Sequence, residues 1–264
     1  MTEEEWTISP NLGKMLFHLS EGNERKLRLF ALSCCQRVRH LVEPDLFDNA
    51  MGALAEYVEG KRPITALASV QPSLLEALNR VQEDSPREEG VQVLTAPFSA
   101  INAVLAAVSS DYRPRFNSAG YTSAMSSLVH FAASVRATPI WDATRDREMT
   151  DRARRGEEDD YLRWLCDIFG NPFRPIAFDP AWGTEATVGL ARGIYDDCAF
   201  ERMPILADAL EEAGCEHADI LAHCREPGVH VRGCWVVDLV LGMGELRTIP
   251  DHAPYRSGTD DTLG

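Results

Sequence analysis

The sequence predicts an all-α protein, a single globular helical domain over residues 1–247. Apolar residues recur at three- and four-residue steps in one segment after another, which places them on one face of a helix. A chain of 264 residues can bury a sizeable core without disulfides. Its apolar fraction of 45% and charged fraction of 25% are ordinary for a globular protein. The periodic segments lie at 24–41, 45–59, 64–81, 97–109, 123–135, 142–170, 185–195, 205–213 and 229–241.

The chain is acidic, with 41 acidic against 26 basic residues and a net charge of −15. This charge repels phosphate backbones and anionic headgroups, so neither a nucleic-acid partner nor a membrane is expected. The start, MTEEEW, has no apolar signal segment, and no run reaches the roughly 18 apolar residues of a spanning helix. The seven cysteines lack the spacing of a disulfide framework. We therefore expect a cytoplasmic protein with reduced thiols.

Proline and glycine interrupt the helical pattern in the N-terminal half. Pro72 lies inside the periodic segment 64–81, so we expect a separate helix after it, capped by Ser73. The polar stretch at 82–92, QEDSPREEGVQ, predicts a loop or a seam between subdomains. At the other end of the chain, residues 248–264 are polar and aperiodic, which predicts a disordered tail.

The helix predicted at 24–41 combines an apolar stripe with a basic face. This face is either a docking patch for an acidic partner or phosphate, or a solvated surface paired with carboxylates. Without interleaved aromatic residues the second interpretation is favoured. Cys34 and Cys35 are either a vicinal redox pair or small buried side chains, and burial is favoured because a reactive thiol needs exposure. The basic residues are Arg25, Lys26, Arg28, Arg37, Arg39 and His40.

Residues 169–182, FGNPFRPIAFDPAW, are predicted to form a long loop. Three residues here precede a proline, and each is restricted toward extended conformations. The aromatic side chains can hold the loop flat on a hydrophobic surface, or they can form the wall of a groove for a peptide partner. The predicted partner surface consists of Phe173, Arg174, Phe178, Trp182 and, from a later segment, Trp235.

The stretch Ile220 to Gly242, ILAHCREPGVHVRGCWVVDLVLG, is the strongest site candidate, because cysteine and histidine concentrate in it and just before it. Thiolate and imidazole are ligands that Zn²⁺ takes in tetrahedral sets of four. The spacing differs from that of zinc fingers, since no CxxC pair is present. If 229–241 is helical, His230 and Cys234 share one face of that helix. The predicted zinc ligands are Cys215, His223, His230 and Cys234.

The same region also fits an interpretation without metal. The segment MPILADALEEAG at 203–214, followed by HVRGCWVVDLVLG, resembles an antiparallel helix pair of the HEAT kind, in which a Val-Arg start and a Leu-Gly end mark the second helix. Cys234 would then lie in the core, and the histidines would cap or satisfy the turn. We favour this packed helix pair over the zinc site.

Three stretches resemble a family of bacterial proteins that is numerous in planctomycetes. They are RKLRLFALSCCQRVRHL at Arg25 to Leu41, IFGNPFRPIAFDPAW at Ile168 to Trp182, and the run from Ala191 to Gly242 that contains HCREPGVHVRGCWVVDLVLG. The family has no established activity. The resemblance therefore implies a lineage and a shared fold, and it transfers neither a reaction nor functional residues.

The sequence contains no complete catalytic or cofactor signature: GxGxxG, P-loop and HExxH motifs are all missing. The leading hypothesis is therefore a protein-interaction or scaffolding module, with the 169–182 loop and the adjoining helix pair as the surface for an unknown protein partner. The alternative is a zinc protein or a metal-dependent enzyme built on the four Cys/His residues. Apart from zinc, no cofactor is expected.

Overall fold

The structure of the protein is a computed structural model. The predicted tail at 248–264 lies outside the residues that it describes, as do three residues of the predicted seam at 82–92. The described residues are 1–8, 10–19, 22–85, 87–88, 91–92, 95–109, 115–117, 120–122, 124–144 and 146–244.

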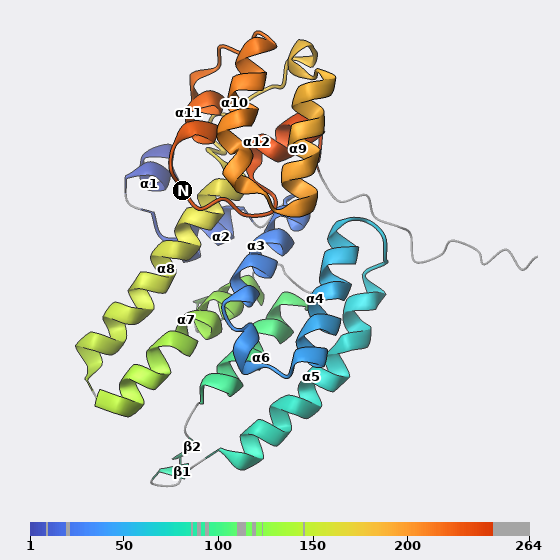
Figure 1. Cartoon of the computed structure of the whole chain (residues 1–264). Coiled ribbons are helices and arrows are strands. Elements are labelled where there is room, and N and C mark those ends of the chain that lie inside the picture. The colour runs from blue at the N-terminus through green and yellow to red at the C-terminus, as the bar shows by residue number, and fades with distance from the viewer. Residues whose placement is uncertain are drawn as a thin grey trace, which may run out of the picture.

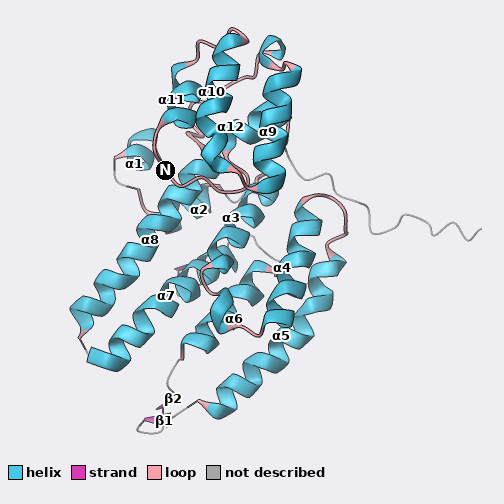
Figure 2. Cartoon of the chain, in the orientation of Figure 1, coloured by secondary structure: helices cyan, strands magenta, loops and turns pink. Residues whose placement is uncertain are grey.

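The all-α prediction is confirmed, because helices make up nearly all of the regular structure (Figures 1 and 2). No helix in the described ranges is both long and apolar enough to cross a membrane. The α-helices are α1 (Glu3–Thr7), α2 (Leu12–His18), α3 (Glu24–Gln36), α4 (Pro44–Val58), α5 (Thr65–Asp84), α6 (Ala96–Ala107), α7 (Ala124–Thr144), α8 (Arg147–Phe169), α9 (Glu185–Asp197), α10 (Met203–Glu212), α11 (Ala218–Arg225) and α12 (Trp235–Leu241).

Short 3₁₀ helices and two small hairpins connect these helices. The hairpins are antiparallel and account for all strands among the described residues. Strands and 3₁₀ helices are β1 (Arg87–Glu88) with β2 (Val91–Gln92), β3 (Arg115–Asn117) with β4 (Gly120–Thr122), η1 (Arg39–Leu41), η2 (Pro180–Trp182) and η3 (Phe200–Arg202).

The helix break predicted at Pro72 is wrong. Helix α5 runs unbroken from Thr65 to Asp84 with Pro72 inside it, so Ser73 does not start a helix. A proline in a helix interior removes one hydrogen bond and crowds the preceding turn. Leu67 and Leu74, on either side of it, are fully buried. Packing of this face against the core outweighs the local preference of proline.

Local sequence sets the ends of α8 and α9. The Asp146 side chain caps α8 by accepting hydrogen bonds from two N–H groups of the first turn, and the Thr184 hydroxyl caps α9 by accepting one, from the Thr187 N–H. Helix α8 ends at Gly170, whose φ of 62° favours glycine. Helix α9 ends at Cys198, the one non-glycine residue with positive φ in the described part of the chain.

Two hydrophobic clusters make up the interior. The first is built by α1 to α8 and the second by α9 to α12. Figure 1 shows α9 to α12 grouped at one end of the molecule and α4 to α8 toward the other, with α3 between them. Helix α12 contacts both α8 and α9, so it belongs to the second cluster and touches the first.

Two glycines allow the hydrophobic clusters to approach each other closely. A Cβ atom on Gly233, where φ is 96°, would lie 2.8 Å from Leu29 Cδ1 of α3. A Cβ atom on Gly170 would lie 3.1 Å from the ring of Trp235. Both the backbone conformation and the lack of space therefore require glycine at these two positions.

The region predicted as a HEAT-like pair is helical, but it contains three helices. Residues 218–225 form a helix of their own, α11, and the second helix of the predicted pair begins at Trp235 instead of residue 229. Pro227, Gly228 and Gly233 fall in the intervening loop, where residues of such low helix propensity are common.

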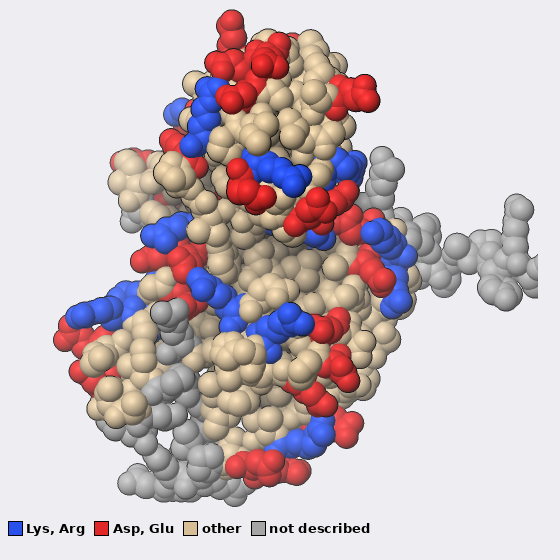
Figure 3. All heavy atoms as spheres, viewed as in Figure 1, with Lys and Arg blue, Asp and Glu red and all other residues tan. Residues whose placement is uncertain are grey.

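The basic face predicted on residues 25–40 is divided between the interior and surface ion pairs. Arg25 and Arg28 are buried, whereas Arg37 and Arg39 form ion pairs with carboxylates. Figure 3 shows Lys and Arg side chains interspersed with Asp and Glu over the visible face. This arrangement fits the paired-surface interpretation and leaves no extended basic patch on that face.

Cys34 and Cys35 lie in the first hydrophobic cluster with no exposed surface. Burial raises the pKa of both thiols. Both features favour small buried side chains over a reactive redox pair.

Candidate metal centre

Four side chains with metal-binding atoms meet where the two hydrophobic clusters join. Asp167 comes from the last turn of α8 and His223 from α11, His230 lies in the loop after α11, and Cys234 directly precedes α12. Their donor atoms all lie within 4.8 Å of one another. We call these four residues the donor cluster.

Four of the distances between donor atoms can be compared with the edges of a tetrahedron around one ion. Zinc bonds to nitrogen, oxygen and sulfur give edges of about 3.3 to 3.7 Å. His223 Nε2 lies 3.2 Å from both Asp167 Oδ1 and Cys234 Sγ. His230 Nδ1 lies 4.0 Å from the same sulfur and is hydrogen-bonded to Asp167 Oδ1 at 2.6 Å. This last contact must lengthen by about 0.7 Å to accommodate zinc, and the distance from His223 Nε2 to the sulfur must lengthen by a few tenths of an ångström.

Asp167 organises the donor cluster. Its Oδ2 accepts a hydrogen bond from the Val231 N–H at 2.9 Å, while its Oδ1 faces both imidazoles. Burial raises the pKa of this carboxyl, but the hydrogen bonds from His223, His230 and the Val231 N–H outweigh burial, and the pKa lies below its ordinary value. Asp167 is therefore ionised, which is the form that binds a metal.

Cys234 is the fully buried member of the donor cluster. Burial and the nearby charge of Asp167 raise the pKa of its thiol well above the ordinary value. A metal ion is the partner that makes a thiolate favourable in such a place, and binding it releases the thiol proton to solvent.

The structure brings together three of the four predicted zinc ligands, His223, His230 and Cys234. The fourth, Cys215, is buried in the second hydrophobic cluster and is not part of the donor cluster. Asp167 takes its place and was not predicted. The available signal was a charged residue in the apolar end of α8, LCDIFG. The shared helical face expected for His230 and Cys234 is wrong, because α12 begins after both, and the loop brings them together.

The predicted partner surface is largely packed onto the molecule. Phe173 packs against α1 and α2, and Arg174 pairs with a glutamate of α1 at 2.5 Å. Phe178 and Trp182 form an edge-to-face pair against the second hydrophobic cluster, with ring centres 5.7 Å apart. Trp235 lies beside the donor cluster. The loop thus spans both hydrophobic clusters, as the first of its two interpretations expects.

A second polar group also joins the two hydrophobic clusters. Arg25 of α3 donates to Asp238 of α12 at 2.6 Å and to the Tyr195 hydroxyl of α9 at 2.9 Å. Tyr195 in turn donates to Glu59 at 2.6 Å. Burial opposes the charge of Arg25, but Asp238 and Tyr195 more than offset burial and raise the pKa of the guanidinium. We call Arg25, Asp238, Tyr195 and Glu59 the charge cluster.

Comparisons of the chain with protein-family profiles, curated proteins and solved structures found no match. The resemblance to the planctomycete family therefore stays a prediction. The chemistry of the site rests on its residues, which offer one carboxylate, two imidazoles and one thiol. Such a set suits Zn²⁺ or a similar transition metal, because Mg²⁺ and Ca²⁺ prefer oxygen ligands throughout.

Proposed function

We propose that the protein binds a transition-metal ion, in the first instance Zn²⁺, through the donor cluster, and that the ion fastens the two hydrophobic clusters together. The observation that supports this most strongly is the convergence of four donor atoms within 4.8 Å. They come from α8, α11 and the segment before α12, so an ion between them would cross-link helices of both hydrophobic clusters.

A structural ion fits the donor cluster better than a catalytic one. Four protein ligands complete the tetrahedral coordination of zinc, whereas catalytic zinc keeps one position open for water or substrate. The site is also shielded: the side chain of His223 is 21% exposed, and those of His230 and Asp167 are 9% and 4% exposed. The expected cytoplasmic setting would keep the thiol reduced and available.

The test is the metal content of protein purified without an affinity tag, measured by elemental analysis. We expect one zinc ion per chain, and we expect Cys234→Ser and Asp167→Asn each to lose it. Protein that contains no metal, and takes up none when Zn²⁺ is added, would contradict the proposal.

Cys215→Ser is the matched control for Cys234→Ser. Both thiols are fully buried in the second hydrophobic cluster, but only Cys234 belongs to the donor cluster. The control should keep its zinc. If Cys215→Ser lost the ion and Cys234→Ser kept it, the ligand set predicted from sequence would replace the one proposed here.

Protein interaction through the 169–182 loop is the second candidate function. It is supported by the partly exposed ring pair of Phe178 and Trp182, on the same loop as the exposed Arg174. A pulldown from lysate tests it by comparing the wild type with Trp182→Ala. The variant must first be shown to have the same melting temperature as the wild type. Loss of a retained partner in the variant supports the interaction module, and deletion of 173–182 that leaves every partner retained contradicts it.

A further inference from the structure

We infer that the pocket beside the donor cluster binds a small organic monocarboxylate with an aromatic or aliphatic body, whose carboxylate pairs with Lys26. The pocket has a volume of about 880 Å³, within the range of roughly 300 to 1,000 Å³ typical of ligand sites. It lies between the two hydrophobic clusters, and such junctions commonly hold ligands. This pocket site requires no metal, although His223 belongs both to its wall and to the donor cluster.

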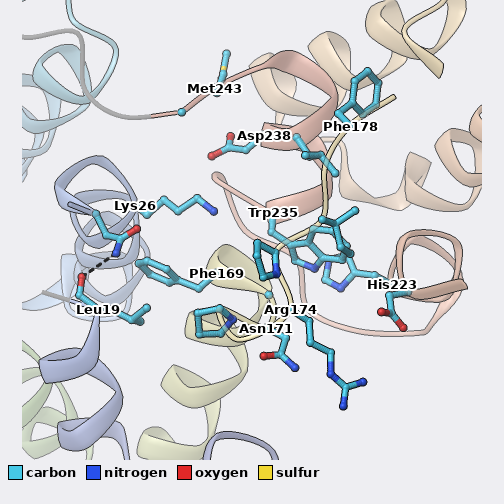
Figure 4. Close-up of a pocket in the computed structure, with 18 of the residues that line it drawn as sticks. Leu19, Lys26, Phe169, Asn171, Arg174, Phe178, His223, Trp235, Asp238 and Met243 are labelled. Carbon is cyan, nitrogen blue, oxygen red and sulfur yellow. Dashed lines mark hydrogen bonds between the residues drawn. The ribbon is translucent and has the colours of Figure 1, made fainter. Parts of the chain in front are cut away.

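The walls of the pocket are suited to the body of such a ligand. Phe169, the last residue of α8, forms one side of the pocket. Ile176 and Phe178 come from the 169–182 loop, and Trp235 and Leu239 come from α12. Figure 4 shows the Phe169 and Trp235 rings on the walls around the same space. These aromatic and aliphatic side chains favour a ligand with an apolar body, and the polar and charged side chains that complete the wall favour a ligand with one charged end.

Lys26 is a cation that the pocket leaves without a close counter-charge. Its side chain extends from α3 into the pocket, and its Nζ lies 5.5 Å from the centre of the Phe169 ring (Figure 4). Among the described residues no carboxylate oxygen lies within 4.0 Å of this ammonium group. Burial lowers the pKa of Lys26, and the attraction of Asp238 offsets this only in part, so the charged form is costly there. An anionic ligand would offset that cost.

The charged residues of the pocket explain why one negative charge is preferred over two. Asp238 faces the same space, but its two oxygens lie 2.6 and 3.5 Å from nitrogens of Arg25. Asp219 and Glu226 are exposed lining residues. Arg174 also lines the pocket, but it is paired with a glutamate of α1. Lys26 is therefore the cation left for a ligand, and a monocarboxylate balances its single charge better than a dianion such as phosphate does.

The experiment is a saturation-transfer NMR titration with phenylacetate, its neutral isostere phenylacetamide and inorganic phosphate. We expect saturable binding of phenylacetate and binding of phenylacetamide weaker by about ten-fold, because the amide lacks the charge that pairs with Lys26. Lys26→Met should weaken phenylacetate by a similar factor. Lys61→Met, at an exposed lysine outside the pocket, should leave it unchanged.

Several results would overturn the assignment. Equal binding of phenylacetate and phenylacetamide would show that charge does not matter, and this comparison needs no variant. Displacement of phenylacetate by phosphate would replace the monocarboxylate with a general anion. Loss of binding in Cys234→Ser but not in Lys26→Met would place the ligand on the metal. By contrast, binding of phenylacetate by Cys234→Ser, together with loss of zinc, would support the assignment, because it would show that the two sites are separate.

Discussion

The charge cluster and the donor cluster perform the same task with different chemistry. Both are polar groups between the two hydrophobic clusters, and both join helices that are far apart in the sequence. In the charge cluster, a buried guanidinium meets a carboxylate at 2.6 Å and a tyrosine hydroxyl, so opposite charges satisfy one another. In the donor cluster, one carboxylate serves two imidazoles beside a thiol whose ionisation burial opposes. The residues of the charge cluster satisfy one another without any added group, whereas the donor cluster has the residue types of a metal-ligand shell.

The largest expected effect comes from breaking the charge cluster. Asp238→Ala leaves Arg25 charged and without its carboxylate in a buried site, so we expect a loss of about 3 to 5 kcal/mol in the free energy of unfolding. Urea unfolding measures it. The double variant Arg25→Met/Asp238→Leu, which removes both charges, should recover most of that loss. A loss below about 1 kcal/mol in Asp238→Ala would show that water reaches the guanidinium.

A metal ion bound at the donor cluster should stabilise the whole fold. At a free Zn²⁺ concentration of 100 times the Kd, the metal should add about 2.7 kcal/mol to the stability of the fold. Thermal melts with Zn²⁺ and with chelator measure this difference. Asp238→Ala, if folded, should keep the zinc-dependent shift and Cys234→Ser should lose it. Equal shifts in both variants would mean that zinc binds elsewhere.

The close approach of the two hydrophobic clusters can be tested with a variant that changes neither the charge cluster nor the donor cluster. Gly233→Ala introduces a Cβ atom 2.8 Å from Leu29 at a φ of 96°, and we expect a cost of about 2 to 3 kcal/mol. Gly214→Ala is the control, because φ is also positive, 89°, but no atom lies within 4 Å of the new Cβ. It should cost only about 1 kcal/mol. Equal losses would mean that the junction yields to the methyl group.

The smallest expected effect is in Tyr195→Phe. The change removes the hydroxyl that accepts from Arg25 and donates to Glu59, but it keeps the buried ring. Because Asp238 still pairs with Arg25, we expect a loss of about 1 kcal/mol. Chemical unfolding of the variant measures it, and a loss as large as that of Asp238→Ala would make the hydroxyl, not the carboxylate, the main partner of Arg25.

Periodicity predicted most of the helices because each buries one face along its own length. The segment at 45–59, for example, corresponds to α4 at Pro44–Val58. Pro72 failed as a helix break because packing from distant helices determined the outcome, and no local signal reports such packing. The same limit applies to charge, since Arg25 and Arg28 resemble surface residues in sequence and are buried in the fold.

The donor cluster likewise combines residues that are close in sequence with one residue that only the fold brings near. His223, His230 and Cys234 follow one another within a short segment, so their grouping was predictable from sequence. Asp167 reaches them only because α8 packs against α12, and it is one of many carboxylates in the 142–170 segment. Sequence proximity is the only measure of distance that a sequence offers, and it points to Cys215 instead.

Cys198, at the left-handed end of α9, gives the chain a natural labelling position. Of the seven thiols it is the exposed one, whereas five are buried and Cys166 is half-buried with a pKa that burial raises. A maleimide fluorophore or spin label added to the native protein should therefore attach there first. With a second label on a helix of the first hydrophobic cluster, the distance between the two labels would report whether the two ends of the protein move apart when metal is withdrawn.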